Sequence, residues 1–444
     1  MSNGRRDLDE ESRREERTHM PRRLVSSLGT TAVLSLVLAA CGGDGDADSA
    51  TGDGGDGTLT VSVWNLEGTP EFQALFDAFE EAHPDITVEP VDILADDYEE
   101  KLTAMLAGGD QTDVITIKNV MEYGEYANRG QLLDITDVVE SADTSDLAGL
   151  EAFDVDGSYF AMPYRQDFWV IYYNKTLFDE AGIDYPDTIT WDEYVDIAEQ
   201  LTEGEDEDKV YGTYHHTWRS VTQAISAAQT GGDLLGGDYS FFADQYEVAV
   251  GLQESGAAMD FGTANAQQAS YQTMFETGAT AMLPMGTWYI AAILAAEERG
   301  DTDVDWGIAP MAQRPDTDEV ISFGSPTAFA VNENAANADA AKEFVEFAAS
   351  AEGAKAIAEI GVVPALQTSE ITETYFSLDG MPDDELSKKA FEPDVVELEM
   401  PVSERTADID EILNQEHELI MVGDKSIEDG LSTMSERVRT EVRD

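Results

Sequence analysis

Carboxylates are the side chains that could do most of the chemistry in this sequence. Aspartate and glutamate number 92 among 444 residues, against 25 lysines and arginines, five histidines and one cysteine. Two carboxylates that face each other can hydrolyse a glycosidic bond. At this abundance such pairs arise along the whole chain, so their presence does not indicate that reaction. A nucleophile elbow, a P-loop and an HExxH sequence are all missing, and we expect a protein that is not an enzyme.

The histidines do not form the pattern of a metal site. His215 and His216 are adjacent, and the side chains of neighbouring residues usually diverge, while His19, His83 and His417 lie far away along the chain. The twelve-residue calcium loop with its closing glutamate is not found among the acidic residues. We therefore expect neither a metal ion nor another cofactor.

The charge of the chain limits its partners. The formal net charge is −67 at pH 7, and so acidic a surface repels both nucleic acid and anionic lipid, which require basic faces. Carboxylates hold water, and screening over about 3 Å at molar salt relieves their mutual repulsion. We interpret the acidity as an adaptation to high salt. An acidic lineage without a salt requirement is the alternative, and neither interpretation names a function.

The single cysteine lies in an informative context. Arg22 and Arg23 precede an apolar stretch, residues 24–40, that ends in the letters LAA directly before Cys41. This order resembles the bacterial lipobox, in which the chain is cut before a cysteine whose sulfur is acylated. An ordinary secretory signal or a short membrane anchor with an incidental cysteine is the alternative.

The segments around Cys41 then predict how the protein is held. Residues 1–40 are expected to be a signal peptide, with Met20 as an alternative start because the residues before it are highly charged. Residues 41–57 are rich in glycine, aspartate and serine, which is typical of a flexible tether. No later segment has 18 uninterrupted apolar residues. We expect a soluble domain anchored by lipid to the outer face of the cytoplasmic membrane.

The region after the tether alternates strands and helices. Residues 59–64 and 113–117 are apolar and strand-like, and the pattern at 86–88 is similar. Residues 71–81 carry apolar side chains at helical spacing, and 98–106 predict a second helix. This β-α-β-α-β order favours a parallel sheet covered by helices.

The same α/β pattern recurs in the rest of the chain. Because it recurs, we expect two α/β lobes, with ligands bound at the loops that follow strands. The expected strands are 168–173, 280–283 (leading into a loop at 284–287) and 328–331; the expected helices are 191–202, capped by Thr190, 340–349, and a helix-rich end at 409–438.

Eight stretches resemble the family 1 extracellular solute-binding proteins, whose best-known members bind maltose and other sugars for ABC transporters. In order they are VSVWN, FEEAHPDITVEPV, YEEKLTAMLAGGDQTDVITI, YANRGQLLDIT, MPYRQDFWVIYYNKTLFDEAGIDYPDTITWDEY, FETGATAMLPMGTWYI, WGIAPMAQRP and AAKEFVEFAASAEGAKAIAEIGVVP. The block with YYNKTLFDEAGI is the most specific. Together the stretches cover nearly the whole chain after the tether.

The resemblance implies a periplasmic-binding-protein-like fold, in which two lobes close on a ligand held in the cleft between them. The chain would cross between lobes at three hinge residues, Pro163, Gly324 and Pro364. One lobe would hold residues 58–162 and 325–363, and the other 164–323 and 365–444.

The resemblance also implies the partners. The chain would be a monomer that captures a mono- or oligosaccharide outside the cell and delivers it to the transmembrane subunits of an ABC permease. It would itself do no chemistry, and lipid on Cys41 would link it to the membrane.

Sugars are bound by flat aromatic faces and by polar groups around their hydroxyls. Trp288 matches the family position where an aromatic ring often stacks on sugar, with a core tryptophan as the alternative. Trp218 lies in a polar stretch and is a further candidate. Trp64 ends the first strand and suits the core as well as a ligand.

The polar candidates follow strands. Asn65 and Glu67 come after the first strand, and Lys118 and Asn119 come after the third, at the expected mouth of the cleft. Each of these side chains is expected to meet the ligand.

Further polar candidates lie near the crossovers. Asp167 occupies a position where related sugar-binding proteins often carry an acidic group that accepts hydroxyl protons. Arg165 and Gln166 are weaker candidates, because strand alternation should point one of the three side chains inward. Ser325 follows Gly324 and is expected to offer its backbone to the ligand or to serve the hinge alone.

Other cargoes and functions remain open at this point. Ferric iron is usually held by clustered tyrosines, and Tyr172 and Tyr173 are adjacent. A glycerol phosphate ester would need a basic pocket, for which Arg165 and Arg219 are available. A polyamine is a third cargo. A surface-tethered glycosidase or lectin is the alternative outside transport.

Overall fold

The computed structural model describes residues 57–442 except 206–207 and 318. The signal peptide expected for residues 1–40, the lipidation of Cys41 and nearly all of the expected tether fall outside these ranges. Among the helices that are described, none is long and apolar enough to cross a membrane.

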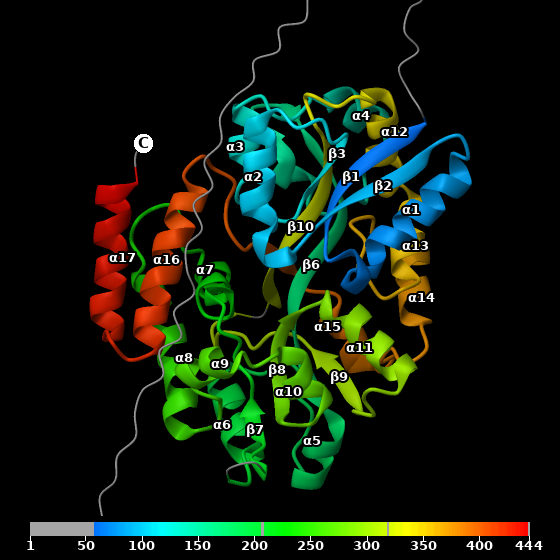
Figure 1. Ribbon diagram of the computed structural model, residues 1–444. Coiled ribbons are helices and arrows are strands. Elements are labelled where there is room, and N and C mark those ends of the chain that lie inside the picture. The colour runs from blue at the N-terminus through cyan, green and yellow to red at the C-terminus, as the bar shows by residue number, and fades with distance from the viewer. Residues whose placement is uncertain (1–56, 206–207, 318, 443–444) are drawn as a thin grey trace, which may run out of the picture. The chain divides into compact units, whose positions relative to one another are not determined.

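The described chain is a mixed α/β fold (Figure 1). Its strands are β1 (Thr58–Trp64), β2 (Thr87–Ile93), β3 (Val114–Ile117), β4 (Asp154–Val155), β5 (Ser158–Tyr159), β6 (Ala161–Asn174), β7 (Tyr211–Thr213), β8 (Thr280–Gly286), β9 (Trp306–Ala309), β10 (Ile321–Val331) and β11 (Val395–Leu398).

Helices cover these strands. They are α1 (Pro70–Ala82), α2 (Tyr98–Gly108), α3 (Tyr123–Asn128), α4 (Thr136–Ser141), α5 (Lys175–Ala181), α6 (Trp191–Leu201), α7 (Gln223–Thr230), α8 (Ala243–Ser255), α9 (Phe261–Gln267), α10 (Tyr271–Glu276), α11 (Tyr289–Arg299), α12 (Ala338–Ala348), α13 (Ala351–Ala358), α14 (Ser369–Phe376), α15 (Glu385–Ala390), α16 (Thr406–Met421) and α17 (Ile427–Glu441). Short 3₁₀ turns include η1 (Leu66–Gly68), η2 (Ala95–Asp97) and η5 (Arg219–Val221).

The first group of strands is built from the N-terminal βαβαβ unit. β1 pairs in parallel with β2 and with β3. The carboxyl ends of these three strands therefore lie at one edge of the sheet, and Asn65, Leu94 and Lys118 are the residues that follow them. The helix α1 buries Phe72, whose neighbours at helical spacing are also buried.

The second group of strands centres on the carboxyl-terminal half of β6. There β6 pairs antiparallel with β8 on one side and with β9 on the other, and β7 joins β8 in parallel. The loops after β7 and β8 carry Trp218 and Trp288.

Two long strands connect the two groups. Figure 1 shows β6 and β10 running side by side from the group of β1–β3 to the group of β8 and β9. β10 pairs antiparallel with β3 at one end and parallel with β11 at the other. The segment around Pro364 lies along the other side of β6, since the Gln166 backbone nitrogen donates to the Val363 carbonyl oxygen at 3.2 Å.

Most elements predicted from the sequence are confirmed, but the expectation of a parallel sheet is only partly correct. β1, β2 and β3 are parallel, whereas β10 runs antiparallel to both β3 and β6, and β6 also runs antiparallel to β8 and β9. The predicted loop at 284–287 is also wrong in part, since β8 continues to Gly286 and pairs with β6 up to that residue.

Candidate ligand-binding site

The two faces of β6 carry different side chains where it runs beside β10. Asp167 stands opposite Ser325 in this antiparallel pair. Because side chains alternate along a strand and directly opposite residues share a face, Arg165, Asp167 and Ser325 lie on one face, which we name the Arg165 face. Gln166 and Phe168 lie on the other, the Gln166 face.

A chain of polar contacts runs along the Arg165 face. The Arg165 guanidinium donates to Glu71, in the first turn of α1. Its Nε lies 2.7 Å from Asp167 Oδ2, an ion pair whose N–H does not point at that oxygen. The Thr287 hydroxyl, after β8, donates to Asp167 Oδ1 at 2.9 Å. One arginine therefore links a helix of the first strand group to a loop of the second.

Burial decides the electrostatics of this series of polar contacts. The side chains of Glu71 and Asp167 are each only 3% exposed. Loss of solvent raises the pKa of both carboxyls, although Arg165 acts in the opposite direction. Burial acts to lower the pKa of Arg165, but the two carboxylates outweigh it and raise that pKa. The guanidinium stays charged and compensates both acids.

Lys118 lies where β3 ends and borders the same face. Its Nζ donates to the Ala95 carbonyl at 3.0 Å and lies 5.7 Å from the centroid of the Trp64 ring. Its own carbonyl accepts a hydrogen bond from the hydroxyl of Thr327, the β10 residue that pairs with Arg165. Asn65 adopts a left-handed conformation (φ 44°), and its Oδ1 accepts from the Ala95 backbone nitrogen at 3.1 Å.

Glu99 of α2 ties the neighbouring residues together. Its carboxylate lies 3.3 Å from the ammonium of Lys118 and accepts from Asn119 Nδ2 at 3.3 Å. Glu67 is exposed on η1, and Leu94 after β2 is 65% exposed, more than any other large apolar side chain recorded as exposed. Polar and apolar groups thus alternate at this edge of the sheet.

An aromatic cluster, which we name the aromatic wall, is built around Trp169, two residues after Asp167 on β6. Trp169 of β6 meets Trp288 edge to face at 5.6 Å between centroids, and Trp218 lies 6.2 Å from Trp288. His216 packs 3.9 Å from Trp218, and Tyr271 lies 6.3 Å from it. Trp218 is 42% exposed, so this cluster presents an accessible flat ring beside the Arg165 face.

The loop that carries Trp218 is held from behind. Arg219, which is buried, donates through Nε to Asp410 of α16 at 2.6 Å. The Ser220 hydroxyl donates to Glu399. These contacts hold the backbone on the C-terminal side of Trp218, and the ring itself packs against His216.

Besides Arg165 Nε, two polar atoms near Asp167 are buried without a hydrogen-bond partner among the described residues. They are the Oγ of Ser325 and the Nε1 of Trp169. Leaving such a group unpaired costs about 1–3 kcal/mol. Ser325 stands opposite Asp167, and Trp169 lies two residues after it on the same face of β6. Both atoms are closed to solvent in this structure, so a ligand would have to displace the side chains that cover them.

The residues predicted to bind ligand gather as follows. They fall into three sets. Arg165, Asp167 and Ser325 lie together on β6 and β10. Asn65, Lys118 and Asn119 lie at the edge of β1–β3, and Trp218 and Trp288 lie on the aromatic wall. Glu67 lies close in sequence to Glu71 but extends into solvent. Trp64 packs edge to face against Phe72 and Tyr98, so it belongs to the core with one ring surface toward Lys118.

The residues predicted as hinges lie on three adjacent segments. Pro163 pairs with Ala328 of β10, and Pro364 stands opposite Arg165. A Cβ at Gly324 would lie 1.9 Å from the Asp167 carbonyl oxygen, so only glycine fits this close approach of two strands. Their role as hinges stays a prediction.

Sequence reasoning missed several neighbours of the site. Glu71 and Thr287 complete the polar chain, Glu99 holds Lys118, and Tyr271 joins the aromatic wall. Leu94 could have been found, because it follows a strand just as Asn65 and Lys118 do. Thr287 follows β8 directly and carries the same signal. Glu71, Glu99 and Tyr271 meet the site only through the tertiary fold, and the sequence carries no local signal for them.

Known proteins of similar sequence and structure share this architecture. The model of the bacterial extracellular solute-binding protein family matches residues 64–355. A diacetylchitobiose-binding protein of Streptomyces coelicolor is 29% identical over 79% of this chain and 84% of its own. A maltooligosaccharide ABC transporter solute-binding lipoprotein of Streptococcus pneumoniae is 24% identical over 74% of this chain and 77% of its own.

Among solved structures, a sugar transporter protein of Rhizobium etli in an open conformation superposes with a TM-score of 0.76 and 34% identity. The match covers 86% of this chain and 99% of that one. The family match spans well over half of the sequence. The chain therefore belongs to the bacterial extracellular solute-binding proteins, and its fold is their two-lobed α/β fold.

Proposed function

We propose that this bacterial extracellular solute-binding protein captures a mono- or oligosaccharide and delivers it to an ABC permease. The sugar would lie against the Arg165 face, between the edge of β1–β3 and the aromatic wall. Relatives named for diacetylchitobiose and maltooligosaccharide support a sugar as the cargo.

The observation that carries the proposal is the accessible tryptophan pair beside unpaired polar atoms. Trp218 and Trp288 offer ring faces for the C–H surface of a sugar. Ser325 Oγ and Trp169 Nε1 lack partners in the described part of the chain, and Asp167 offers an acceptor beside them. Flat apolar surface next to a few convergent polar groups is what a carbohydrate requires.

Closure of the lobes would complete the site. Asn65 and Lys118 belong to one lobe and the aromatic wall to the other, while Arg165 sits on the strand between them. Bending near Pro163, Gly324 and Pro364 would bring the two walls together around the sugar and exclude water from its hydroxyls.

The alternative cargoes fit less well. Arg165 and Arg219 are both buried in ion pairs, and Lys118 is paired with Glu99, so a phosphate ester would have to displace an acid. Tyr172 and Tyr173 are fully buried in β6, where burial raises the pKa of both phenols, so neither is available to ferric iron.

A polyamine would need unpaired carboxylates at the site. Glu71 and Asp167 share the charge of Arg165, and Glu99 is paired with Lys118. The same sharing disfavours glycoside hydrolysis, because a guanidinium that contacts both carboxylates stabilises their ionised forms, whereas that reaction requires one of the two as a protonated acid. We propose a receptor without catalytic activity, acting as a monomer.

The location of the protein follows from its N-terminal sequence. We propose that Cys41 is acylated after removal of residues 1–40 and that residues 41–57 tether the domain to the outer face of the cytoplasmic membrane. The relative from Streptococcus pneumoniae is named as a lipoprotein, which supports this reading of the lipobox-like segment.

A titration of the full chain with a panel of sugars tests the proposal. Intrinsic tryptophan fluorescence is measured in about 1–2 M KCl, where screening relieves the acidic surface, and each mixture is assayed for products. A saturable change with one sugar and no product is the expected result. A response to spermidine, ferric iron or a glycerol phosphate alone would overturn the proposal that the cargo is a sugar. Conversion of a sugar to product would overturn the proposal that the protein is a receptor without catalytic activity.

A further inference from the structure

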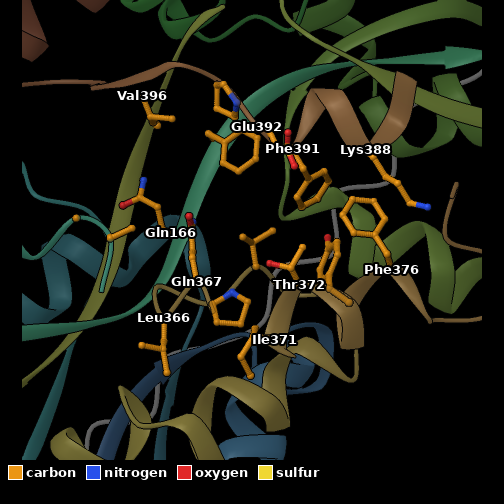
Figure 2. Close-up of a pocket in the computed structure, with 18 of the residues that line it drawn as sticks. Gln166, Leu366, Gln367, Ile371, Thr372, Phe376, Lys388, Phe391, Glu392 and Val396 are labelled. Atoms are coloured by element: carbon orange, nitrogen blue, oxygen red, sulfur yellow. The ribbon is translucent and has the colours of Figure 1, made fainter. Parts of the chain in front are cut away.

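A cavity of about 890 Å³ lies on the Gln166 face of β6, away from the Arg165 face. β6 contributes Gln166 and Phe168, and α14 contributes Ile371 and Phe376. Figure 2 shows Gln166 on one side of the space and Phe376 and Phe391 on the other. We name it the Gln166 cavity. Its volume is that of a site for a drug-sized molecule.

Aromatic rings form the inner wall of the cavity. Phe391, directly after α15, lies at the centre of this wall: its ring centroid is 5.5 Å from that of Phe168, 5.0 Å from that of Tyr375 and 5.0 Å from that of Phe376. Ile371 adds an aliphatic surface. Such a wall favours a ligand with an apolar, preferably aromatic, body.

Carboxylates dominate the rim. Glu151, Glu373, Glu392 and Glu397 line the cavity and are exposed, and Lys388 is the one basic side chain among its lining residues. Within the described ranges none of the four glutamates takes part in an ion pair, so Lys388 alone offsets part of their charge. A cation near the mouth would be attracted, and an anion would be repelled.

We infer that the Gln166 cavity binds an amphiphilic organic cation. Its apolar body packs against Phe168 and Phe391, and its single ammonium group lies at the rim among the carboxylates. The site is separate from the Arg165 face, because alternate side chains of the same strand point into the two. It does not depend on the sugar receptor proposed above.

The probe for this site is 3,3-diphenylpropylamine, which carries two phenyl rings and one ammonium group. Calorimetric titration of the full chain at low ionic strength measures its affinity, beside 3,3-diphenylpropan-1-ol and 3,3-diphenylpropanoate, which share the body but not the charge. Saturable one-to-one binding of the amine is expected, several-fold tighter than the alcohol, with the carboxylate weakest.

Variants locate the binding. Val396 lines the cavity and is 38% exposed, so Val396→Trp fills space with little cost to folding. This variant is expected to raise the dissociation constant of the amine at least about tenfold. The double variant Glu392→Gln, Glu397→Gln should lower the affinity for the amine and leave the affinity for the alcohol unchanged. Glu385→Gln, on an exposed residue outside the lining, is the matched control, and Trp288→Ala should retain full binding.

Two results would overturn the inference. Equal affinities for the amine, the alcohol and the carboxylate would show that the charged rim selects nothing. Amine binding that survives Val396→Trp unchanged, with the variant folded by circular dichroism, would place the molecule elsewhere.

Discussion

Arg165 and Asp167 lie two residues apart on β6, with Nε and Oδ2 separated by 2.7 Å. Because the strand period is two residues, both side chains extend on the same face, and the arginine reaches on to Glu71. A single buried guanidinium therefore compensates two acids from different parts of the fold. Removing it would leave both acids without a partner.

Arg165→Met tests that relationship. With two buried carboxylates uncompensated, we expect the free energy of unfolding to fall by about 3–5 kcal/mol at pH 7. Chemical denaturation of the wild type and the variant measures the difference. Adding Glu71→Gln and Asp167→Asn to Arg165→Met removes the stranded charges and should recover much of the loss. A single variant as stable as the wild type would contradict the described ion pair.

Trp288→Ala tests the aromatic wall. Loss of a stacking ring is expected to raise the dissociation constant for the sugar about tenfold, which corresponds to about 1.4 kcal/mol. Trp288→Phe keeps a smaller ring, and its dissociation constant should lie between those of the wild type and Trp288→Ala. Trp191, in α6, packs against Tyr194 and has no ring contact with Trp288, and it supplies the control Trp191→Phe. An unchanged dissociation constant in Trp288→Ala would remove this ring from the site.

His417 predicts a dependence of stability on pH. It is buried, its Nδ1 is hydrogen-bonded to the Tyr246 hydroxyl at 2.9 Å, and burial lowers its pKa from 6.5 to about 3. Between these two pKa values the unfolded chain is protonated at His417 and the folded chain is not. The contribution of His417 to the free energy of unfolding is therefore complete above pH 6.5 and is lost as the pH falls from 6.5 toward 3.

His417→Gln isolates that contribution. Between pH 7 and pH 5 the wild type should lose about 2 kcal/mol more than the variant, as one extra proton requires. Glu122 acts in the opposite sense, because burial, with Glu99 and other acids nearby, raises its pKa to about 7. That contribution is common to both proteins and cancels in the comparison. Parallel stability curves would show that His417 titrates normally in the folded state.

The net charge of −67 predicts a response to salt. Repulsion between exposed carboxylates is screened over about 10 Å at 0.1 M salt and about 3 Å at 1 M. We expect the midpoint of thermal unfolding to rise between 0.1 M and 2 M KCl. Sucrose at matched osmolality is the control for general exclusion effects. A midpoint that does not move, or falls, would favour an acidic lineage without salt adaptation.

Cys41→Ser tests the anchor. The wild-type chain, expressed in a bacterium with lipoprotein processing, is expected to partition with the membrane fraction and to incorporate labelled palmitate at Cys41. The variant should be released or remain unprocessed, with no label. Replacing Met20 by Ala shows which start is used, since loss of expression would mean that translation begins there.

The local order of elements could be predicted from the sequence. Helix α6 has its expected N-cap, because Thr190 forms a capping box with Glu193, a signal written in adjacent residues. The strands β1 and β3 likewise follow from short apolar runs. The long strands β6 and β10 were recognised only in pieces, since their polar middle residues interrupt the apolar pattern.

The site could be predicted in part. Residues that directly follow strands, such as Asn65 and Lys118, were found because sheet topology places such loops together. Glu71 was not predicted, because its partner Arg165 lies 94 positions away and nothing in the amphipathic pattern of α1 marks a buried acid. Alternation was expected to turn one of three residues inward, whereas it turns Arg165 and Asp167 to one face and Gln166 to the other.

The same alternation makes β6 sensitive to the number of residues it contains. Deleting Gln166 alone would shift every following side chain by half a period and turn Phe168 toward the position of Asp167. Deleting two neighbouring residues would restore the phase at the cost of a shorter crossing. Insertions and deletions in this strand are therefore tolerated, if at all, only in even numbers, and natural length variation among relatives should accumulate in the loops on either side of it.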